Sequence, residues 1–455
     1  MDVVKYSKRI NGTLSVHPKN PRYFTDNSGK AIYLTGSHTW ENFQSFSREK
    51  YKKFDFENYI NTMQKKNHNF IRLWIWEQAA WMPGNDEMTV VEPLPYKRTG
   101  PGAALDGKPK FNLDKWNEEF FILLRKNIIS AAEKGIYVSV MLFEGWSVRK
   151  LWLPGDPWKG HPYHCDNNVN GVDGDNNGDD IADIHCLEIP SVVKRQKEFI
   201  SKVIDTVNDL DNVLYEIINE GPGDDRFMDW EIYMVNFIHE YESTKPKQHP
   251  AGMTASGNGN EETILFECPA EWISPSYIMD PRYKNDPPAA DGRKIILNDT
   301  DHVENQLTVY HNWVWKCFTR GHHPIFMDPW DSEEFCGMDM ETPEALKRLE
   351  LIRNNMGYSL TFAERIDLSN MVPRIDISTT YYCLASVGSE YLVYLPDGGS
   401  VILTLSDEQT IYAIEWFEPL TGKTVTADNV TGSGKTRFTS PFFADAVLYI
   451  RKIKL

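Results

Sequence analysis

Residues 191–222 read SVVKRQKEFISKVIDTVNDLDNVLYEIINEGP and contain one complete unit of the chain's architecture. Apolar residues recur at helical spacing after Pro190, which predicts an amphipathic helix over Ser191–Leu210. Val213–Asn219 is almost continuously apolar, as expected of a strand that is buried on both faces. The strand stops at the polar side chain of Glu220 before a Gly-Pro turn. The run is therefore a helix followed by a buried strand that ends on polar groups.

The same alternation extends from Ala31 to Asp328 and predicts an α/β fold with parallel strands. A further helix is predicted over Trp116–Lys134, where Gly135 is a stop signal. Eight such units favour a closed (β/α)8 TIM barrel, and a doubly wound open sheet is the alternative. The predicted strands are Ala31–Gly36, Phe70–Trp76, Ile136–Phe143, Val213–Asn219, His249–Thr254, Trp272–Tyr277, Lys294–Asp299 and Pro324–Asp328.

The two ends of the chain have a different sequence pattern from this central part. Residues 1–28 contain an extended stretch at Leu14–Tyr23 that predicts a hairpin packed on the barrel. Residues 29–366 form the predicted barrel. Residues 367–455 predict a small antiparallel β-sandwich, because short strand patterns there are separated by tight-turn signals. The predicted strands are Ile375–Thr379, Tyr381–Ala385, Tyr391–Leu395, Val401–Leu405, Ile411–Phe417 and Ala446–Ile450.

Composition excludes several classes of protein. The 455 residues carry 65 acidic and 48 basic side chains, a net charge of −17, which argues against a nucleic-acid partner. We expect no membrane span, because no window approaches 18 consecutive apolar residues. Six cysteines are too few for a disulfide scaffold. Cys165 and Cys186 flank one acidic loop, where a disulfide and two free thiols are both open.

The end of the strand at Asn219-Glu220 is the best candidate for chemistry. Strand alternation places Glu216, Ile218 and Glu220 on one side, with Glu220 where the strand opens to the mouth of the barrel. A carboxyl group partly desolvated there has a raised pKa and can protonate a leaving oxygen. We therefore interpret Glu220 as a general acid.

With these residues the chain resembles the clan-A-type (β/α)8 retaining glycoside hydrolases, in which an Asn-Glu pair ends strand four and a carboxylate nucleophile ends strand seven. The resemblance is strongest to the apiosidase-like, cellulase-type branch. It rests on Asn219-Glu220, on Arg72-Leu73-Trp74, on NPRYFTD at 20–26 and on LTGSHTW at 34–40. The segment WFEPLTG at 416–422 is similar to a small β domain of the collagen-binding type.

The resemblance implies an enzyme that cleaves O-glycosidic bonds of a plant or algal polysaccharide or oligosaccharide. It leads us to expect an extracellular or periplasmic location. The N-terminus lacks the apolar stretch of a secretory signal, so a cytoplasmic location stays open. A catalytically inactive carbohydrate-binding or adhesion protein is the alternative from another class.

The partner carboxylate is expected from the strand-seven segment Lys294–His302, which offers Asp299 and Asp301. We favour Asp301, by matching Asp-Thr-Asp to the Asp-Gly-Glu of the resembled enzymes. Retention requires two carboxyl groups about 5–5.5 Å apart, whereas inversion leaves about 6.5–9.5 Å for a water molecule. Because Asp is one methylene shorter than Glu, an inverting mechanism stays open.

Strand ends and long loops supply the remaining candidates. The predicted substrate-binding residues are His38, Trp40, Arg72, Glu144, Asn219, Tyr277, His302, Asp328 and Trp330, which could stack on a sugar ring or bind its hydroxyl groups. We expect the non-periodic segments Met82–Phe111 and Leu151–Glu188 to be loops that shape the pocket. No cofactor is expected.

An acidic loop could hold a structural calcium ion. Oxygen ligands alternate at Asp173, Asp175, Asn177 and Asp179, and glycine occupies the sixth position. Ile184 stands at the twelfth position, where calcium loops of the EF-hand type carry glutamate. A solvated turn or a sugar-binding loop is therefore the alternative.

Overall fold

The computed structural model describes residues 9–47, 54–82, 88–148, 150, 155–223, 225–255, 261–302, 310–330, 334–335, 338–406, 410–432 and 434–453. The chain divides into two compact units, which are described separately below. The first comprises Met1–Leu14, His38–Thr62 and Ile71–Met279, and the second Ser15–Ser37, Met63–Phe70 and Asp280–Leu455. Within the described ranges, no helix has the length and apolar character needed to cross a membrane.

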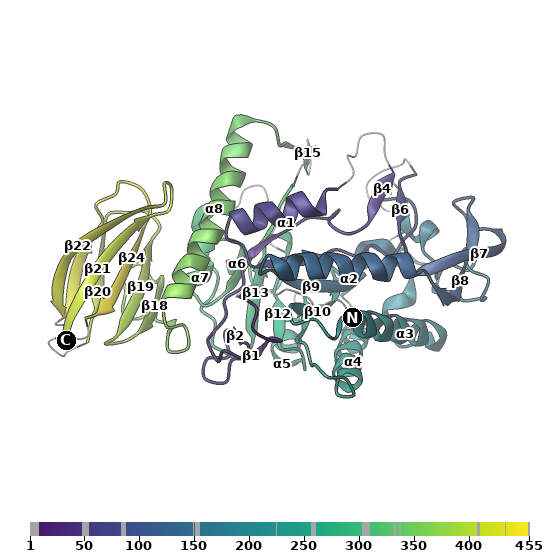
Figure 1. Ribbon diagram of the computed structural model, residues 1–455, viewed down its shortest axis with the longest axis horizontal. Coiled ribbons are helices and arrows are strands. Elements are labelled where there is room, and N and C mark those ends of the chain that lie inside the picture. Colours follow the sequence, from purple (N-terminus) through teal and green to yellow (C-terminus); the bar gives the residue numbers. More distant parts are fainter. Residues whose placement is uncertain are drawn as a thin grey trace. The chain divides into compact units, whose positions relative to one another are not determined.

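Eight parallel strands close into a barrel in the order β10-β11-β12-β13-β14-β3-β5-β9. Four of them, β9, β10, β12 and β13, are labelled in Figure 1. The closed ring confirms the (β/α)8 prediction and excludes the open doubly wound sheet. Strands β9 and β10 are buried along their whole length, because the inside of the barrel and the outer helices cover both faces. The strands are β3 (Gly36–His38), β5 (Phe70–Leu73), β9 (Tyr137–Glu144), β10 (Val213–Asn219), β11 (Ala251–Thr254), β12 (Trp272–Ser274), β13 (Ile295–Asp299) and β14 (His323–Met327).

Helices follow the strands along the chain. The two helices predicted from periodicity are confirmed to within three residues: Trp116–Lys134 corresponds to α2, and Ser191–Leu210 corresponds to α3. The helices are α1 (Phe56–Lys65), α2 (Glu118–Glu133), α3 (Pro190–Val207), α4 (Asp225–Glu242), α5 (Glu261–Glu267), α6 (Arg282–Asn285), α7 (His311–Thr319) and α8 (Pro343–Arg365).

The first barrel strand lies later in the chain than predicted. The pattern predicts a strand over Ala31–Gly36, whereas β3 spans Gly36–His38. Ile32 instead forms an antiparallel bridge with Phe24 of β2 (Phe24–Thr25), and β2 also pairs with β1 (Ser15–Val16). Residues in this stretch therefore extend the N-terminal hairpin before the chain enters the barrel.

The prediction that Met82–Phe111 is an irregular loop is wrong. Beyond residues 83–87, which lie outside the described residues, it contains β6 (Val90–Glu92), paired with β4 (Ser45–Ser47), and most of the hairpin β7–β8. Strand β7 spans Tyr96–Ala103 and β8 spans Pro109–Trp116. Only a few side chains of this hairpin are buried, so its alternation was too weak to recognise among prolines and glycines.

The second long segment is a packed loop in its described part, which begins at residue 155. Trp158, Tyr163 and Ile184 join one hydrophobic cluster with Tyr96 and Phe111 of the β7–β8 hairpin. The short helices η2 (Pro157–Gly160) and η3 (Asp183–His185) lie within it. Cys165 and Cys186 are free thiols, so the disulfide alternative is excluded.

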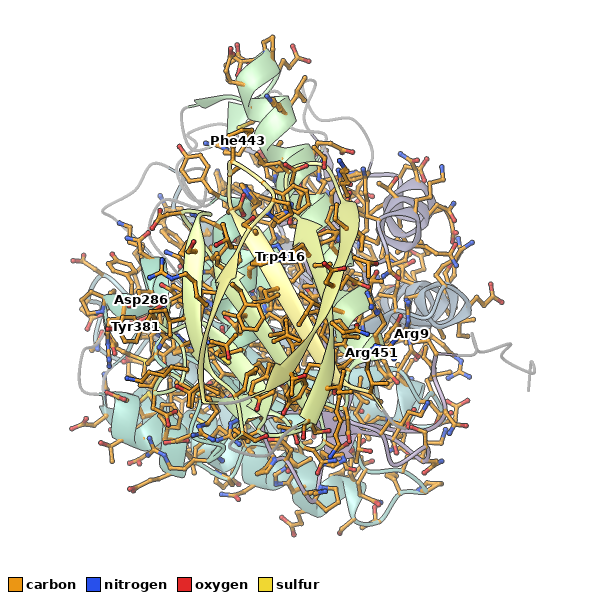
Figure 2. All side chains as sticks on the ribbon, turned by 90° about the vertical axis from the view of Figure 1, so that its left-hand side faces the viewer. Arg9, Asp286, Tyr381, Trp416, Phe443 and Arg451 are labelled. Carbon is orange, nitrogen blue, oxygen red and sulfur yellow. The ribbon has the colours of Figure 1, made fainter. Side chains whose placement is uncertain are left out.

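The C-terminal region of the second unit is antiparallel, and its yellow strands face the viewer in Figure 2. A six-stranded sheet and a two-stranded sheet share a hydrophobic core that includes Val393, Trp416, Leu448, Leu403 and Phe438. The six strands, in sheet order, are β17 (Val372–Pro373), β18 (Cys383–Ser386), β19 (Glu390–Leu395), β24 (Ala446–Lys452), β21 (Thr410–Glu418) and β22 (Lys423–Gly432). The two-stranded sheet pairs β20 (Ser400–Thr404) with β23 (Lys435–Thr439). A further pair is β15 (Glu334–Phe335) with β16 (Met338–Asp339).

The C-terminal strands differ from the prediction in two ways. Residues 375–379 make one bridge, between Ser378 and Leu403, instead of a strand. Strands β22 and β23 were not predicted, because most of their side chains are polar and β22 is exposed at the edge of its sheet. The apolar alternation on which strand prediction depends is absent there.

The other face of the six-stranded sheet packs on α7 and α8 within the second unit. Trp315 of α7 is fully buried, stacks on Tyr394 of β19 and contacts Phe417 of β21. Its indole donates to Asn355 of α8 at 2.7 Å, and Asn355 donates in turn to the carbonyl of Pro419 at 3.1 Å. This packing supports a stabilising role for the C-terminal sheets.

We expect Trp315→Ala to lower the free energy of unfolding by about 3–5 kcal/mol, because it leaves a large cavity in this interface. Tyr381→Ala is the control: Tyr381 is 61% exposed, and its loss should change stability by less than about 0.5 kcal/mol. Urea unfolding followed by fluorescence and circular dichroism would measure both. Equal stability of the two variants would contradict the packing role.

Candidate active site

The end of β10 places Glu220 on a constrained backbone. Glu220 has a φ of 45°, in the left-handed region that few residues other than glycine adopt. Gly145, which follows β9, packs directly against it, since a Cβ at position 145 would lie 2.0 Å from the carbonyl oxygen of Glu220. Constrained backbone of this kind is concentrated at functional sites. The local structure thus constrains the backbone of the half-buried Glu220.

A buried ion pair lies beside the strand that carries Glu220. Arg72 of β5 makes a two-armed contact with the buried carboxylate of Glu216, in which Nε donates to Oε2 at 2.8 Å. Arg72 Nη2 also donates to Asn219 Oδ1 at 2.8 Å. Because a guanidinium can only donate, it fixes the Asn219 amide with its oxygen toward Arg72 and its NH2 group directed elsewhere. The predicted residue Arg72 therefore acts on Asn219 from within the protein.

His38 and Glu144 are also buried completely. His38 stacks on Trp74 with ring centroids 5.8 Å apart, and its Nε2 lies 3.5 Å from Arg72 Nη1. Glu144 Oε1 accepts the backbone N–H of Trp146 at 2.9 Å. Both predicted residues thus contact protein groups that lie next to Asn219 and Glu220.

Trp146 is a site residue that sequence reasoning missed. It lies in the short helix η1 (Gly145–Val148) directly after β9, and its indole Nε1 donates a hydrogen bond to Glu220 Oε2. Trp146 and Glu220 are both half-buried. The signal that could have found it is the Glu-Gly-Trp sequence at the end of a predicted barrel strand, the position where catalytic residues gather.

Glu77, also missed, connects the strand ends to the long loop. Its carboxylate accepts the backbone N–H of Glu144 at 2.9 Å and lies 3.3 Å from His185 Nε2 and 3.5 Å from His161 Nε2. Burial alone would raise the pKa of Glu77, but the hydrogen bonds and charges of the two histidines outweigh it and lower the pKa to about 2. Burial lowers the pKa of His161. The ionised Glu77 thus holds both histidines of the loop.

The lowered pKa predicts a pH-dependent stability. The ionised form is favoured by folding, so its contribution is present above the ordinary pKa of 4.5 and is lost as the pH falls toward about 2. We expect Glu77→Gln to lower the free energy of unfolding by roughly 3 kcal/mol at pH 7 and by less than half of that at pH 3. Urea unfolding at both pH values measures this, and an equal loss at both would contradict it.

The strand-seven carboxylates belong to the second unit. Asp299 ends β13, is 1% exposed, and accepts the backbone N–H of Asp301 at 3.0 Å. Asp301 lies in the short helix η4 (Thr300–His302) with its side chain 6% exposed, and its Oδ2 lies 3.9 Å from Nε2 of the buried His302. Thr300 accepts the backbone N–H of Met327 at the end of β14. Asp299 thus braces the turn that presents Asp301.

Asp328, Trp330, Trp40 and Tyr277 complete the predicted positions. Asp328 is fully buried after β14 and forms a two-armed ion pair with Arg353 of α8, whose guanidinium also lies 5.4 Å from the centroid of Trp330. Trp40 and Tyr277 are half-buried in turns, with the Trp40 carbonyl accepting the indole of Trp76 at 2.9 Å. Trp330, Trp40 and Tyr277 are thus partly exposed. The carboxylate of Asp328, in contrast, is engaged by Arg353.

The acidic loop directs its oxygens to its own backbone. Asp173, Asp175, Asn177 and Asp179 each accept an N–H group two or three positions further along, at 2.9–3.2 Å. Lys150 lies 2.8 Å from the second oxygen of Asp175. Calcium binding by this loop stays a prediction.

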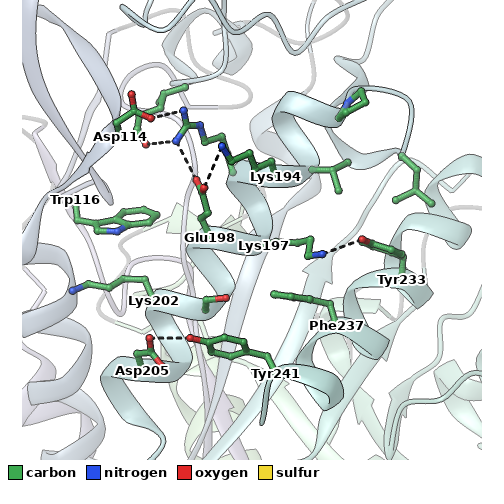
Figure 3. A pocket seen from close by; sticks show the side chains of 16 residues that line it. Asp114, Trp116, Lys194, Lys197, Glu198, Lys202, Asp205, Tyr233, Phe237 and Tyr241 are labelled. Carbon is green, nitrogen blue, oxygen red and sulfur yellow. Dashed lines mark hydrogen bonds and ion pairs between the residues drawn. The ribbon is translucent and has the colours of Figure 1, made fainter. Parts of the chain in front are cut away.

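A hollow of about 1080 Å3 lies between α3 and α4 of the first unit (Figure 3). None of the predicted site residues is among the 16 residues that line it. Its charged groups are mutually engaged: Arg195 pairs with Asp114 and Glu198, and Tyr241 donates to Asp205 at 3.0 Å. The hollow is therefore distinct from the strand ends where Glu220 lies.

Comparison with known proteins identifies two parts of the chain. Residues 18–163 match the family described as "Apiosidase-like, catalytic domain". Residues 370–450 match the family described as "Putative collagen-binding domain of a collagenase". No curated protein matches the chain in sequence.

Solved structures share the fold over nearly the whole length. A glycoside hydrolase family 5 protein from Bacteroides vulgatus is 13% identical, with a TM-score of 0.64 over 97% of this chain and 92% of its own. A second structure, described as a glycoside hydrolase, is 13% identical, with a TM-score of 0.61 over 97% of each chain. At this identity the likeness shows the fold, and the catalytic-domain match adds the class: the protein is a glycoside hydrolase.

Proposed function

We propose that the protein hydrolyses an O-glycoside with retention of configuration, using Glu220 as acid/base and Asp301 as nucleophile. The observation that carries the proposal is the place of these residues in the barrel. Glu220 follows β10, the fourth barrel strand along the chain, and Asp301 follows β13, the seventh. In (β/α)8 enzymes the catalytic groups come from the C-terminal ends of the strands, which share one rim. Topology thus supports a carboxyl pair.

The choice of Asp301 over Asp299 is supported by what each carboxylate does in the second unit. Asp299 is buried and accepts the backbone N–H of Asp301, so one of its oxygens serves the turn. The Asp301 side chain retains 6% of its surface exposed, whereas Asp299 is 1% exposed. His302 lies beside Asp301, with its Nε2 3.9 Å from Asp301 Oδ2.

In the first step Glu220 protonates the glycosidic oxygen while Asp301 attacks the anomeric carbon, so that the leaving alcohol departs and a glycosyl ester forms. Glu220, now ionised, then takes a proton from water, which attacks the ester and releases the sugar. Asn219, whose amide is fixed by Arg72, donates to the hydroxyl next to the reacting carbon. This contact strengthens as charge develops in the transition state.

The substrate class is proposed from the family match and the residues at the strand ends. The apiosidase-like description favours apiosides, and half-buried rings at Trp40, Tyr277 and Trp330 suit stacking on sugars of a plant or algal glycan. We propose a panel of 4-nitrophenyl glycosides that includes an apioside, together with plant and algal polysaccharides. NMR of the first product should show retained anomeric configuration.

A product with inverted configuration would contradict the proposed nucleophile. It would indicate instead that the second carboxylate is a base that activates water, with the two carboxyl groups further apart. Binding of a glycan without any turnover across the panel would contradict the enzymatic proposal and favour a carbohydrate-binding protein.

A further inference from the structure

The indole of Trp146 occupies one oxygen of the Glu220 carboxyl group. Trp146 Nε1 donates to Glu220 Oε2, and an indole N–H can donate a hydrogen bond but cannot accept one. Oε2 is therefore the oxygen that accepts the indole N–H. Both residues are half-buried, so the pair lies where a substrate can approach it.

The turn that carries Trp146 is held on both sides. The backbone N–H of Trp146 donates to Glu144 Oε1 at 2.9 Å. The backbone N–H of Glu144 donates in turn to Glu77 Oε1 at 2.9 Å. Gly145 leaves no space for a side chain between this turn and the Glu220 backbone. A ring attached to such a turn has few alternative positions, so its hydrogen bond to Glu220 is built into the fold.

We propose that Trp146 is a positioning residue that reserves Oε2 of Glu220 and keeps the transferable proton on Oε1. This inference rests on the proposed role of Glu220 as acid/base. In the neutral acid, a proton on Oε2 would bring the carboxyl O–H and the indole N–H of Trp146 into conflict, because both are donors. The proton therefore stays on Oε1, from which it is transferred to the leaving oxygen. In the ionised form, the same N–H stabilises the carboxylate that must next accept a proton from water.

Trp146→Phe removes the N–H donor and keeps an aromatic ring. Loss of a donor to the ionised form raises the pKa of Glu220, so the acid form persists to higher pH. We expect the basic limb of the kcat/KM profile to move up by about one pH unit. We also expect turnover of 4-nitrophenyl glycosides to fall roughly tenfold, with a smaller effect on 2,4-dinitrophenyl glycosides, whose departure needs little proton transfer.

The control is Trp116→Phe, which removes an indole from the outer wall of the hollow between α3 and α4. It should leave the pH profile and turnover unchanged. If Trp146→Phe gives the same profile as Trp116→Phe, Trp146 has no positioning role.

A spectroscopic measurement separates this inference from the proposed function. The 1H–15N indole signal of Trp146, assigned by its absence in Trp146→Phe, should shift with pH and lose that titration in Glu220→Gln. An indole signal that does not titrate overturns the inference. If the signal titrates while Glu220→Gln retains full turnover, the hydrogen bond stands and the acid/base function of Glu220 fails.

Discussion

Glu220→Gln should lower turnover of unactivated glycosides by about 10³-fold while leaving the fold intact, because general acid–base catalysis contributes about 10²- to 10⁴-fold. The amide keeps the size of the side chain and an oxygen to accept the indole of Trp146, but it cannot deliver a proton. Steady-state kinetics on the best substrate of the panel measures the loss, and circular dichroism checks the fold.

Azide provides the internal check on this variant. A small anionic nucleophile needs no general base, so azide should restore turnover of a 2,4-dinitrophenyl glycoside by Glu220→Gln and give a glycosyl azide. Glu188→Gln is the matched control, because the Glu188 side chain is 57% exposed and pairs with Arg226 on the surface. Full activity of Glu220→Gln would remove Glu220 from the mechanism.

Arg72→Met should lower the free energy of unfolding by about 3–5 kcal/mol, because it leaves the buried carboxylate of Glu216 without its partner. It should also reduce turnover in the remaining folded protein, since the Asn219 amide loses the donor that fixes it. Urea unfolding and kinetics at a temperature where the variant is folded would separate the two effects.

Arg125→Met is the matched control for stability. Arg125 makes a two-armed pair with Asp209, as Arg72 does with Glu216, but both side chains are partly exposed to solvent. Removing an exposed pair should cost less than about 1 kcal/mol. If Arg72→Met costs no more than Arg125→Met, the buried pair does not hold the strand ends as described.

The barrel could be predicted from the sequence because its strands are buried on both faces and its helices are amphipathic. Val213–Asn219 is matched residue for residue by β10. Strands whose side chains are mostly polar, such as β22 and β23, lack that signal and were missed. The first barrel strand was displaced because Ile32 pairs with Phe24, a contact that depends on a hairpin and not on local pattern.

The position of Asn219 and Glu220 at the end of a strand could be predicted from the sequence, since β10 ends at Asn219, whereas their chemical roles stay predictions. The partners of Trp146 and Glu77 could not be predicted, since these contacts join different strand ends to one another and to the loop of His161 and His185. A tryptophan or a buried glutamate at a strand end has many structural uses, and only coordinates show which partner it meets.

We propose above that Glu220 and Asp301 act as a pair on one glycosidic bond. Glu220→Gln treated with a 2,4-dinitrophenyl glycoside should form the glycosyl ester and then stall, because the base for the second step is absent. Mass spectrometry of the digested protein should find the sugar on the peptide that contains Asp301, and Asp301→Asn in the same background should abolish the adduct. Sugar attached to another carboxylate, or an adduct that survives Asp301→Asn, would contradict the account.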